Sequence, residues 1–154
     1  MKGTFGMNVA YFLIPKANVV WLSSDASVED AIARLDESGY TAVPLLSPEG
    51  HYAGTFSEGD LMRHLVRSGR ADLTQALRTP LVDVQRRAQI RPVGIEAHIE
   101  ELFDRALEQN FVPVVDSRGA FVGIVRRREI LQRSMSALRD EREVDRAVVR
   151  GSRP

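Results

Sequence analysis

Three consecutive arginines, Arg126, Arg127 and Arg128, stand where the last predicted strand of the chain meets the last predicted helix. The first turn of a helix offers free backbone N–H groups and the positive end of the helix dipole, and both attract anions. Guanidinium groups add bidentate hydrogen bonds to phosphate oxygens. Because consecutive helix residues point about 100° apart, we expect two of the three arginines to reach one phosphate-bearing ligand. A solvated charged face is the alternative for such a run.

A serine and an aspartate, Ser57 and Asp60, stand at an earlier strand-to-helix junction of the same predicted form. An acidic side chain at such a junction suits the hydroxyls of a ribose. Ser and Asp are also the residues that cap the first turn of a helix when no ligand is present. The sequence leaves both roles open.

The composition argues against catalytic and metal chemistry. The 154 residues include no cysteine, which excludes a thiolate nucleophile, Fe–S clusters and cysteine zinc sites. The three histidines are far apart and have no metal-binding spacing, and no GxSxG motif is present. Lys+Arg and Asp+Glu both number 21, so no net charge favours nucleic acid or an anionic membrane. With no apolar segment near the about 20 residues of a membrane helix, we expect a cytoplasmic protein that is not an enzyme and binds no metal.

The chain contains an internal repeat of about 60 residues. Residues 43–54, VPLLSPEGHYAG, recur as residues 112–123, VPVVDSRGAFVG, at a constant offset of 69. Upstream, residues 28–32 match residues 99–103 at an offset of 71, so the second copy is two residues shorter between its helix and its strand. A repeat of this kind predicts two structurally equivalent halves.

Each copy predicts the same order of elements, β-α-β-β-α. Ser27 and Asp30 resemble a capping box at the start of the first long helix, and Gly39 is expected to end that helix in a left-handed conformation. In the first copy we expect a strand at 19–22, a helix at 27–38, strands at 43–46 and 52–56, and a helix at 58–66. In the second copy we expect a strand at 91–95, a helix at 97–109, strands at 112–115 and 120–125, and a helix at 127–138. This order indicates an α/β (α+β) fold in which the two motifs pack pseudo-symmetrically through their sheets.

The same elements divide the chain into five segments. The expected division is an N-terminal segment 1–15 with a short entry helix at 5–14, a first motif 16–70, a partly helical linker 71–87, a second motif 88–138, and a charged tail 139–154. The tail mixes arginines with acids and is expected to be a fraying helix.

The repeated junction resembles the signature of CBS domains, Gly-h-h-Ser/Thr-x-x-Asp-h, where h is apolar. Residues 54–61, GTFSEGDL, fit the signature fully; residues 123–130, GIVRRREI, have Arg126 in place of the hydroxyl residue and Glu129 in place of the aspartate. A tandem pair of this type implies a Bateman module, whose two pseudo-symmetric clefts bind adenine nucleotides.

Three further segments are similar to the stand-alone CBS-pair proteins of Gram-positive bacteria that bind cyclic di-AMP, the CbpB/DarB type. They are residues 12–15 (FLIP), residues 39–44 (GYTAVP) and residues 127–129 (RRE). The residues that this resemblance places around the ligand in the main cleft are Asn18, Val19, Val20, Tyr40, Thr41, Ala42, Val43, Pro44, Arg126, Arg127, Arg128 and Glu129. The chain departs from the group at Asn18, where the group tends to have Lys, and at Arg126, where it tends to have Thr.

These residue types suit a nucleotide cleft, which needs an apolar slot for a base, backbone groups that read the base edge, and cations for phosphate. Val20, Ala42 and Val43 would form the slot, Tyr40 would stack on a base, and Thr41 would bond a ribose or a phosphate. The alternative for Tyr40 is a half-buried packing role. The residues expected in the second cleft are Ser57, Asp60, Ile90, Arg91, Phe111 and Val112. Because Arg91 is its one evident cation, that cleft suits AMP or a weak ligand.

The resemblance implies a non-enzymatic adenine-nucleotide receptor that needs no cofactor, and the preferred ligand is cyclic di-AMP. It also implies a homodimer and a regulated target, either a metabolic enzyme or a (p)ppGpp-synthesising one. Two alternatives stay open. One is an energy sensor for AMP, ADP or ATP, favoured by the intact Ser57 and Asp60 motif; the other is a dimerisation scaffold with vestigial clefts, favoured by the degraded motif of the second copy.

Overall fold

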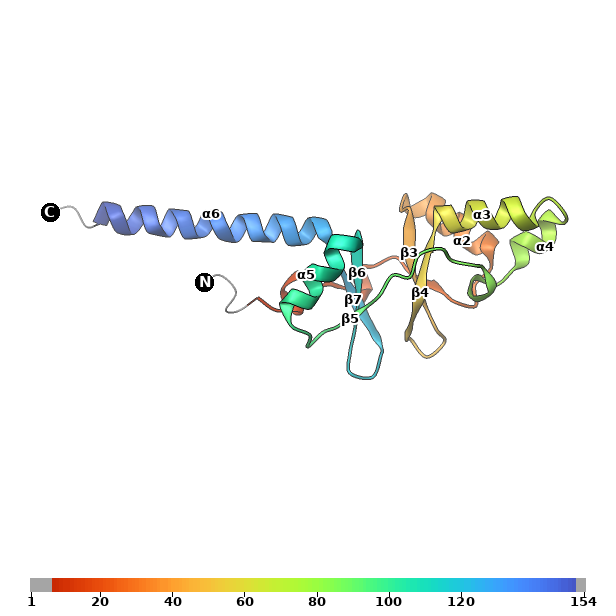
Figure 1. Cartoon of the computed structure of the whole chain (residues 1–154), viewed down its shortest axis with the longest axis horizontal. Helices are drawn as coiled ribbons and strands as arrows, with labels where there is room; N and C mark the ends of the chain where they lie inside the picture. The colour runs from red at the N-terminus through yellow and green to blue at the C-terminus, as the bar shows by residue number, and fades with distance from the viewer. Residues whose placement is uncertain (1–6, 152–154) are drawn as a thin grey trace.

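The computed structural model describes residues 7–151 and contains two small sheets, one from each repeat, between two groups of helices (Figure 1). The elements of the first half are α1 (Val9–Phe12), β1 (Ile14–Pro15), a 3-10 turn η1 (Lys16–Asn18), β2 (Leu22–Ser23), α2 (Val28–Ser38), β3 (Ala42–Leu46), β4 (Tyr52–Ser57) and α3 (Glu58–Ser68). Next come α4 (Leu73–Arg78), a 3-10 turn η2 (Leu81–Asp83), β5 (Val93–Gly94), α5 (Ile99–Glu108), β6 (Phe111–Val115), β7 (Phe121–Arg126) and α6 (Arg127–Gly151). The predicted fold class and the β-α-β-β-α order of each repeat are confirmed.

The two sheets have equivalent registers. In the first, β2 pairs in parallel with β3 so that Leu22 lies opposite Leu45, and β3 and β4 form an antiparallel hairpin. In the second, β5 pairs in parallel with β6 so that Val93 lies opposite Val114, and β6 and β7 form the hairpin. The second sheet gains a fourth strand because β1, from the N-terminal segment, pairs antiparallel with β7. The N-terminal segment is therefore built into the sheet of the distant repeat.

Helix α2 shows how local sequence fixes these elements. The Ser27 hydroxyl accepts a hydrogen bond from the Asp30 N–H, and the Asp30 carboxylate accepts one from the Ser27 N–H, which completes the predicted capping box. Gly39 ends the helix at φ +69°, a conformation that costs glycine little. The apolar stripe of the helix is buried against β3 and β4, so amphipathic spacing and packing agree.

The two halves meet through an apolar layer between their sheets. Its buried members are Leu46, Phe121 and Ile124, and Trp21 and Phe111 pack partly buried against them. The hairpin turns also touch, since the Phe121 N–H donates to the Gly50 carbonyl at 3.0 Å. This layer fixes the end of β7 beside the start of β3, where the arginines and the Gly-Tyr-Thr-Ala segment stand.

Some predicted boundaries are wrong. Helix α1 covers only Val9–Phe12, and residues 1–6 of the N-terminal prediction lie outside the described residues. The short strands β2 and β5 begin two to three residues later than expected, because pairing with β3 and β6 starts only at Leu22 and Val93. The helix expected to stop at residue 138 continues to Gly151, while residues 152–154 of the tail lie outside the described part.

The length of α6 has a local cause. No glycine or proline interrupts residues 127–150, and oppositely charged residues stand four positions apart, as at Glu129 and Arg133, where the two groups are 3.8 Å apart. In Figure 1 the helix extends away from both sheets. Across residues 7–151, none of the helices combines the length and apolar character needed to span a bilayer.

Candidate functional site

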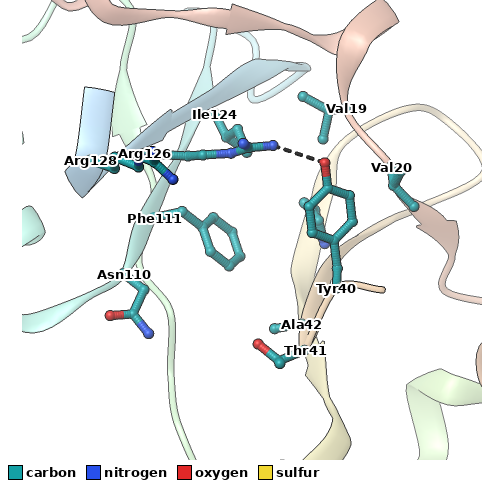
Figure 2. Close-up of a pocket in the computed structure, with 11 residues that line it drawn as sticks. Val19, Val20, Tyr40, Thr41, Ala42, Asn110, Phe111, Ile124, Arg126 and Arg128 are labelled. Carbon is teal, nitrogen blue, oxygen red and sulfur yellow. Dashed lines mark hydrogen bonds between the residues drawn. The ribbon is translucent and has the colours of Figure 1, made fainter. Parts of the chain in front are cut away.

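A cavity of about 290 Å³ lies where the two halves meet beside the ends of β3 and β7 (Figure 2). Its lining residues are Val19, Val20, Tyr40, Thr41, Ala42, Pro44, Asn110, Phe111, Ile124, Arg126 and Arg128. Both repeats contribute, so the cavity exists only because the halves are packed together. Its lining includes two arginines and no acidic residue, which makes it electropositive.

Each polar wall of the cavity comes from a junction between elements. Tyr40 and Thr41 follow the left-handed Gly39 that ends α2, so the chain turns there and enters β3 across the mouth of the cavity. Arg126 is the last residue of β7, and Arg128 stands in the first turn of α6. At the start of this long helix the Arg127 N–H donates to the Asn110 carbonyl at 3.0 Å, and the next N–H groups of the first turn lie beside the arginines, a favourable setting for an anion.

Tyr40 and Arg126 are already in contact across the halves. Arg126 Nη2 donates a hydrogen bond to the Tyr40 hydroxyl at 3.1 Å, and the guanidinium carbon lies 5.4 Å from the ring centroid (Figure 2). On the other side of the cavity lies the ring of Phe111. A planar group entering here would meet aromatic and aliphatic surface on both sides and a cation at one edge.

The backbone of Val20 is a further feature of the cavity lining. This residue lines the cavity, and no hydrogen bond from any residue between 7 and 151 satisfies its N–H or its C=O. Backbone polar groups in folded proteins are nearly always paired with protein or water. A donor and an acceptor on one residue match a ligand edge that carries an acceptor beside a donor, as the edge of adenine does.

Arg127 does not line this cavity, contrary to expectation. Its Nε donates to the Ala106 carbonyl at 2.6 Å and its Nη2 to the Leu107 carbonyl at 3.2 Å, so the guanidinium caps the C-terminal end of α5. Because consecutive helix residues point about 100° apart, Arg128 points away from Arg127 and lines the cavity, as does Arg126 at the end of β7.

Three more of the residues expected around the ligand lie elsewhere. Asn18 ends η1 with an exposed side chain, Val43 is fully buried in the core of the first half, and Glu129 lies 3.8 Å from Arg133 on α6. None of the three lines the cavity.

Three lining residues were not expected in the main cleft: Asn110, Phe111 and Ile124. Asn110 stands 69 positions after Thr41, so the repeat itself contained the signal for it. The sequence predicts Phe111 in the second cleft only, yet it lines both cavities. Ile124 is a β7 residue whose role depends on the packing of the two sheets, which no spacing in the sequence encodes.

The second cleft is a smaller cavity of about 180 Å³. Four of its predicted residues line it, namely Ser57, Asp60, Ile90 and Phe111. Val112 is fully buried in the core of the second half, and Arg91 lines a neighbouring cavity instead. Gln109, which the sequence did not single out, lines the second cleft and is almost fully buried.

The Asp60 carboxylate is fully engaged by the protein. One oxygen accepts from the Ser57 N–H at 3.1 Å and from the Ser57 hydroxyl at 2.9 Å; the other accepts from Arg63 Nη2 at 2.6 Å and from the Arg87 N–H at 3.2 Å. The Asp60 N–H in turn donates to the Ser57 hydroxyl, which makes a complete capping box. With only 4% of the residue exposed, the structure favours the capping role over an open ribose site.

Among residues 7–151, no three histidine or acidic side chains are grouped so that they could hold a metal ion.

Comparison with known proteins gives a family match and several similar structures. The model of the CBS domain matches residues 13–67 and 75–136. The crystal structure of CbpB in complex with c-di-AMP is 25% identical with a TM-score of 0.80, over 89% of this chain and 90% of that chain. A CBS domain protein from Streptococcus pneumoniae TIGR4 is 27% identical with a TM-score of 0.74, over 84% and 86%. CBSX2 in complex with AMP is 22% identical with a TM-score of 0.69, over 85% and 98%, which shows the shared fold. No curated protein matches the sequence significantly.

Proposed function

Because the chain belongs to the CBS-domain family, with two CBS domains in tandem, we propose that it is a non-enzymatic receptor for cyclic di-AMP. The ligand binds in the cavity between Val20, Tyr40 and Arg126, and its presence controls the association of the protein with a target protein in the cytoplasm. The observation that carries the proposal is the cavity itself, which combines two arginines, no acid, an unpaired backbone donor and acceptor, and an aromatic slot. The similarity of the chain to CbpB, whose structure was solved with c-di-AMP, supports this choice of ligand.

The chemistry of the cavity fits a ligand with two adenines and two phosphates. One adenine enters the slot between Tyr40 and Phe111, and its edge bonds the N–H and C=O of Val20. Arg126 and Arg128 bind phosphate oxygens. Tyr40 and Thr41 are exposed and mark the open side of the cavity, where the second nucleotide lies.

A ligand in this position couples the two halves. It contacts Tyr40 of the first half and Arg126 of the second, so it favours whichever arrangement of the halves closes on it. Binding then changes the affinity for a partner by the difference in ligand affinity between the two arrangements. The proposed target is a metabolic or (p)ppGpp-synthesising enzyme.

The proposal includes a homodimer. Exposed apolar side chains on α3 (Met62 and Val66) and on α6 (Leu131 and Met135) provide equivalent surfaces on the two halves for a second copy.

A second candidate function is energy sensing through AMP, ADP or ATP in the second cleft. The intact Ser57 and Asp60 motif favours it, but both side chains already serve as a helix cap. A scaffold with empty clefts is a third possibility, and it predicts no response to any nucleotide.

Isothermal titration calorimetry of the full chain distinguishes these functions. The proposal expects binding of cyclic di-AMP at micromolar or lower concentration, stronger than that of AMP, ATP or cyclic di-GMP, and lost when Arg126 and Arg128 are both changed to Ala. Arg127→Ala is the matched control, because that arginine caps α5. Stronger binding of AMP or ATP that survives the double substitution would instead favour energy sensing, and no binding at all would favour the scaffold.

A further inference from the structure

We infer that Gln109 occupies the base-recognition position of the second cleft and so restricts the chain to one nucleotide. The inference rests on the proposed function in one respect, since it takes the backbone at Val20 as the group that reads the base in the main cleft. It concerns a different cavity and a residue to which the proposed ligand site assigns no role.

The side chain of Gln109 is held by three hydrogen bonds. Its Oε1 accepts from the Arg91 N–H at 2.9 Å, and its Nε2 donates to the Arg91 carbonyl at 3.0 Å and to the Phe111 carbonyl at 3.3 Å. Only 6% of the residue is exposed. The reversed amide orientation would set Nε2 against the Arg91 N–H, donor against donor, so the bonding pattern is compatible with one orientation only.

The backbone of Arg91 is the counterpart of the backbone of Val20. Leu22 in β2 lies opposite Leu45, and Val93 in β5 lies opposite Val114, which stands 69 positions after Leu45. Val20 and Arg91 each stand two residues before these equivalent strand positions. The same donor and acceptor are therefore unpaired in the main cleft and paired by Gln109 in the second.

The carboxamide of glutamine presents the same pattern as the edge of adenine, an acceptor beside an N–H donor. An adenine that bonded Arg91 in the second cleft would need the two atoms that Gln109 already bonds. Gln109 thus acts as an intramolecular substitute for the base, and an incoming nucleotide must displace a buried group and its three hydrogen bonds.

The shorter connection in the second repeat accounts for this difference between the halves. Tyr40 stands three residues before Val43, and Gln109 stands three residues before Val112. In the first repeat Gly39 separates Tyr40 from the helix, and the tyrosine reaches across to Arg126. In the second repeat Gln109 follows α5 directly as the C-cap of that helix. The side chain of Gln109 bonds the backbone of Arg91, which belongs to the same half.

The test is a gain of binding, which a merely structural glutamine would not produce. AMP is titrated by calorimetry into the full chain as wild type, as Gln109→Ser and as Gln109→Ala, with Gln132→Ser on the exposed face of α6 as control. The inference expects both Gln109 variants to bind one more AMP per chain than wild type. The affinity of the second cleft for AMP should be at least about tenfold higher in the variants than in wild type. Adding Ala88→Glu, which puts a further acid in the second cleft and none in the main cleft, is expected to remove the new event.

Folded Gln109 variants that bind no additional AMP would overturn the inference, whatever the main cleft does. A parallel titration with cyclic di-AMP reports on the proposed function separately, because it probes the main cleft in all proteins. If the variants do not fold, the side-chain NH₂ of Gln109 is followed by NMR in the wild type. Strong protection from hydrogen exchange and no shift at millimolar AMP are expected; rapid exchange or displacement by AMP would contradict the inference.

Discussion

Arg126 Nη2 donates a hydrogen bond to the Tyr40 hydroxyl at 3.1 Å, which joins two residues 86 positions apart in the sequence. One comes from the first repeat and the other from the second, and both line the main cavity. The cation that would meet a phosphate is therefore positioned by an aromatic side chain of the opposite half. A ligand that engages either residue also bears on the packing between the halves.

Arg128→Ala and Arg126→Ala are each expected to weaken cyclic di-AMP binding by about 10- to 100-fold. Each substitution removes charge-assisted hydrogen bonds to a phosphate, worth roughly 1.5–3 kcal/mol. The side chain of Arg128 has no hydrogen bond or ion pair with any of residues 7–151, so its loss should leave the stability of the fold unchanged. Calorimetric titration measures the affinity, and thermal unfolding checks the fold.

Arg127→Ala is expected to show the opposite pattern. It removes the hydrogen bonds to the Ala106 and Leu107 carbonyls at the end of α5, which lowers the free energy of unfolding by about 1 kcal/mol. The unfolding temperature should fall by about 2–4 °C while cyclic di-AMP affinity stays within about twofold. A large loss of affinity with unchanged stability would move Arg127 back into the binding site.

Tyr40 is expected to act mainly through its ring. Tyr40→Phe removes the hydrogen bond to Arg126 but keeps the stacking surface, so affinity should fall about two- to fivefold. Tyr40→Ala also removes the stacking surface opposite Phe111 and should lower the affinity for cyclic di-AMP by about tenfold or more. Equal affinities for the two variants would show that the ring does not contact the base.

The repeat and the helix caps account for what the sequence predicts well. Ser27 with Asp30 and Ser57 with Asp60 are local signals, and both form the capping boxes that their spacing suggests. The Val-Pro and glycine pattern places both hairpins to within one residue. Such features depend on a few residues that are close in the sequence, so the local sequence is enough to predict them.

The site needs information that spacing does not carry. The contact between Tyr40 and Arg126 depends on how two sheets pack, and the direction of Arg127 depends on which carbonyls at the end of α5 remain unpaired. The role of Gln109 could not be predicted from the sequence for a related reason. A lone polar residue after a helix is usually solvent-exposed, and only the fold shows that it reaches the backbone of Arg91.

Tyr52 is expected to make the fold sensitive to alkali. Its hydroxyl donates to the Ile90 carbonyl at 2.8 Å, and burial raises the pKa of its phenol to about 12 from an ordinary value of 10.0. As the pH rises, the unfolded chain releases the Tyr52 proton before the folded protein does. The contribution of this phenol to the free energy of unfolding is therefore complete below about pH 10 and is lost as the pH rises toward about 12. The loss is on the order of 2–3 kcal/mol.

Tyr52→Phe removes this titration and provides the comparison. The variant should be less stable than wild type near pH 8, because the Ile90 carbonyl loses its partner, but its stability should decline less between pH 9 and pH 11. Thermal unfolding at several pH values measures how the stability of each protein changes with pH. Titrations that the two proteins share cancel when one slope is subtracted from the other. Parallel slopes would contradict the raised pKa.

The equivalent glycines Gly54 and Gly123 are expected to tolerate alanine very differently. A Cβ at Gly123 would collide with the Ile14 carbonyl, a backbone group fixed by the pairing of β1 with β7, so Gly123→Ala should cost about 3 kcal/mol or more. At Gly54, where φ is +121°, the colliding group is the guanidinium of Arg86, the movable end of a side chain that donates to the Ala53 carbonyl. Gly54→Ala should cost about 1–2 kcal/mol, from backbone strain and that lost bond. Chemical denaturation gives the free energy of unfolding of both variants. Equal losses of stability would mean that β1 can move away from β7, and that the N-terminal segment is not firmly attached to the second half.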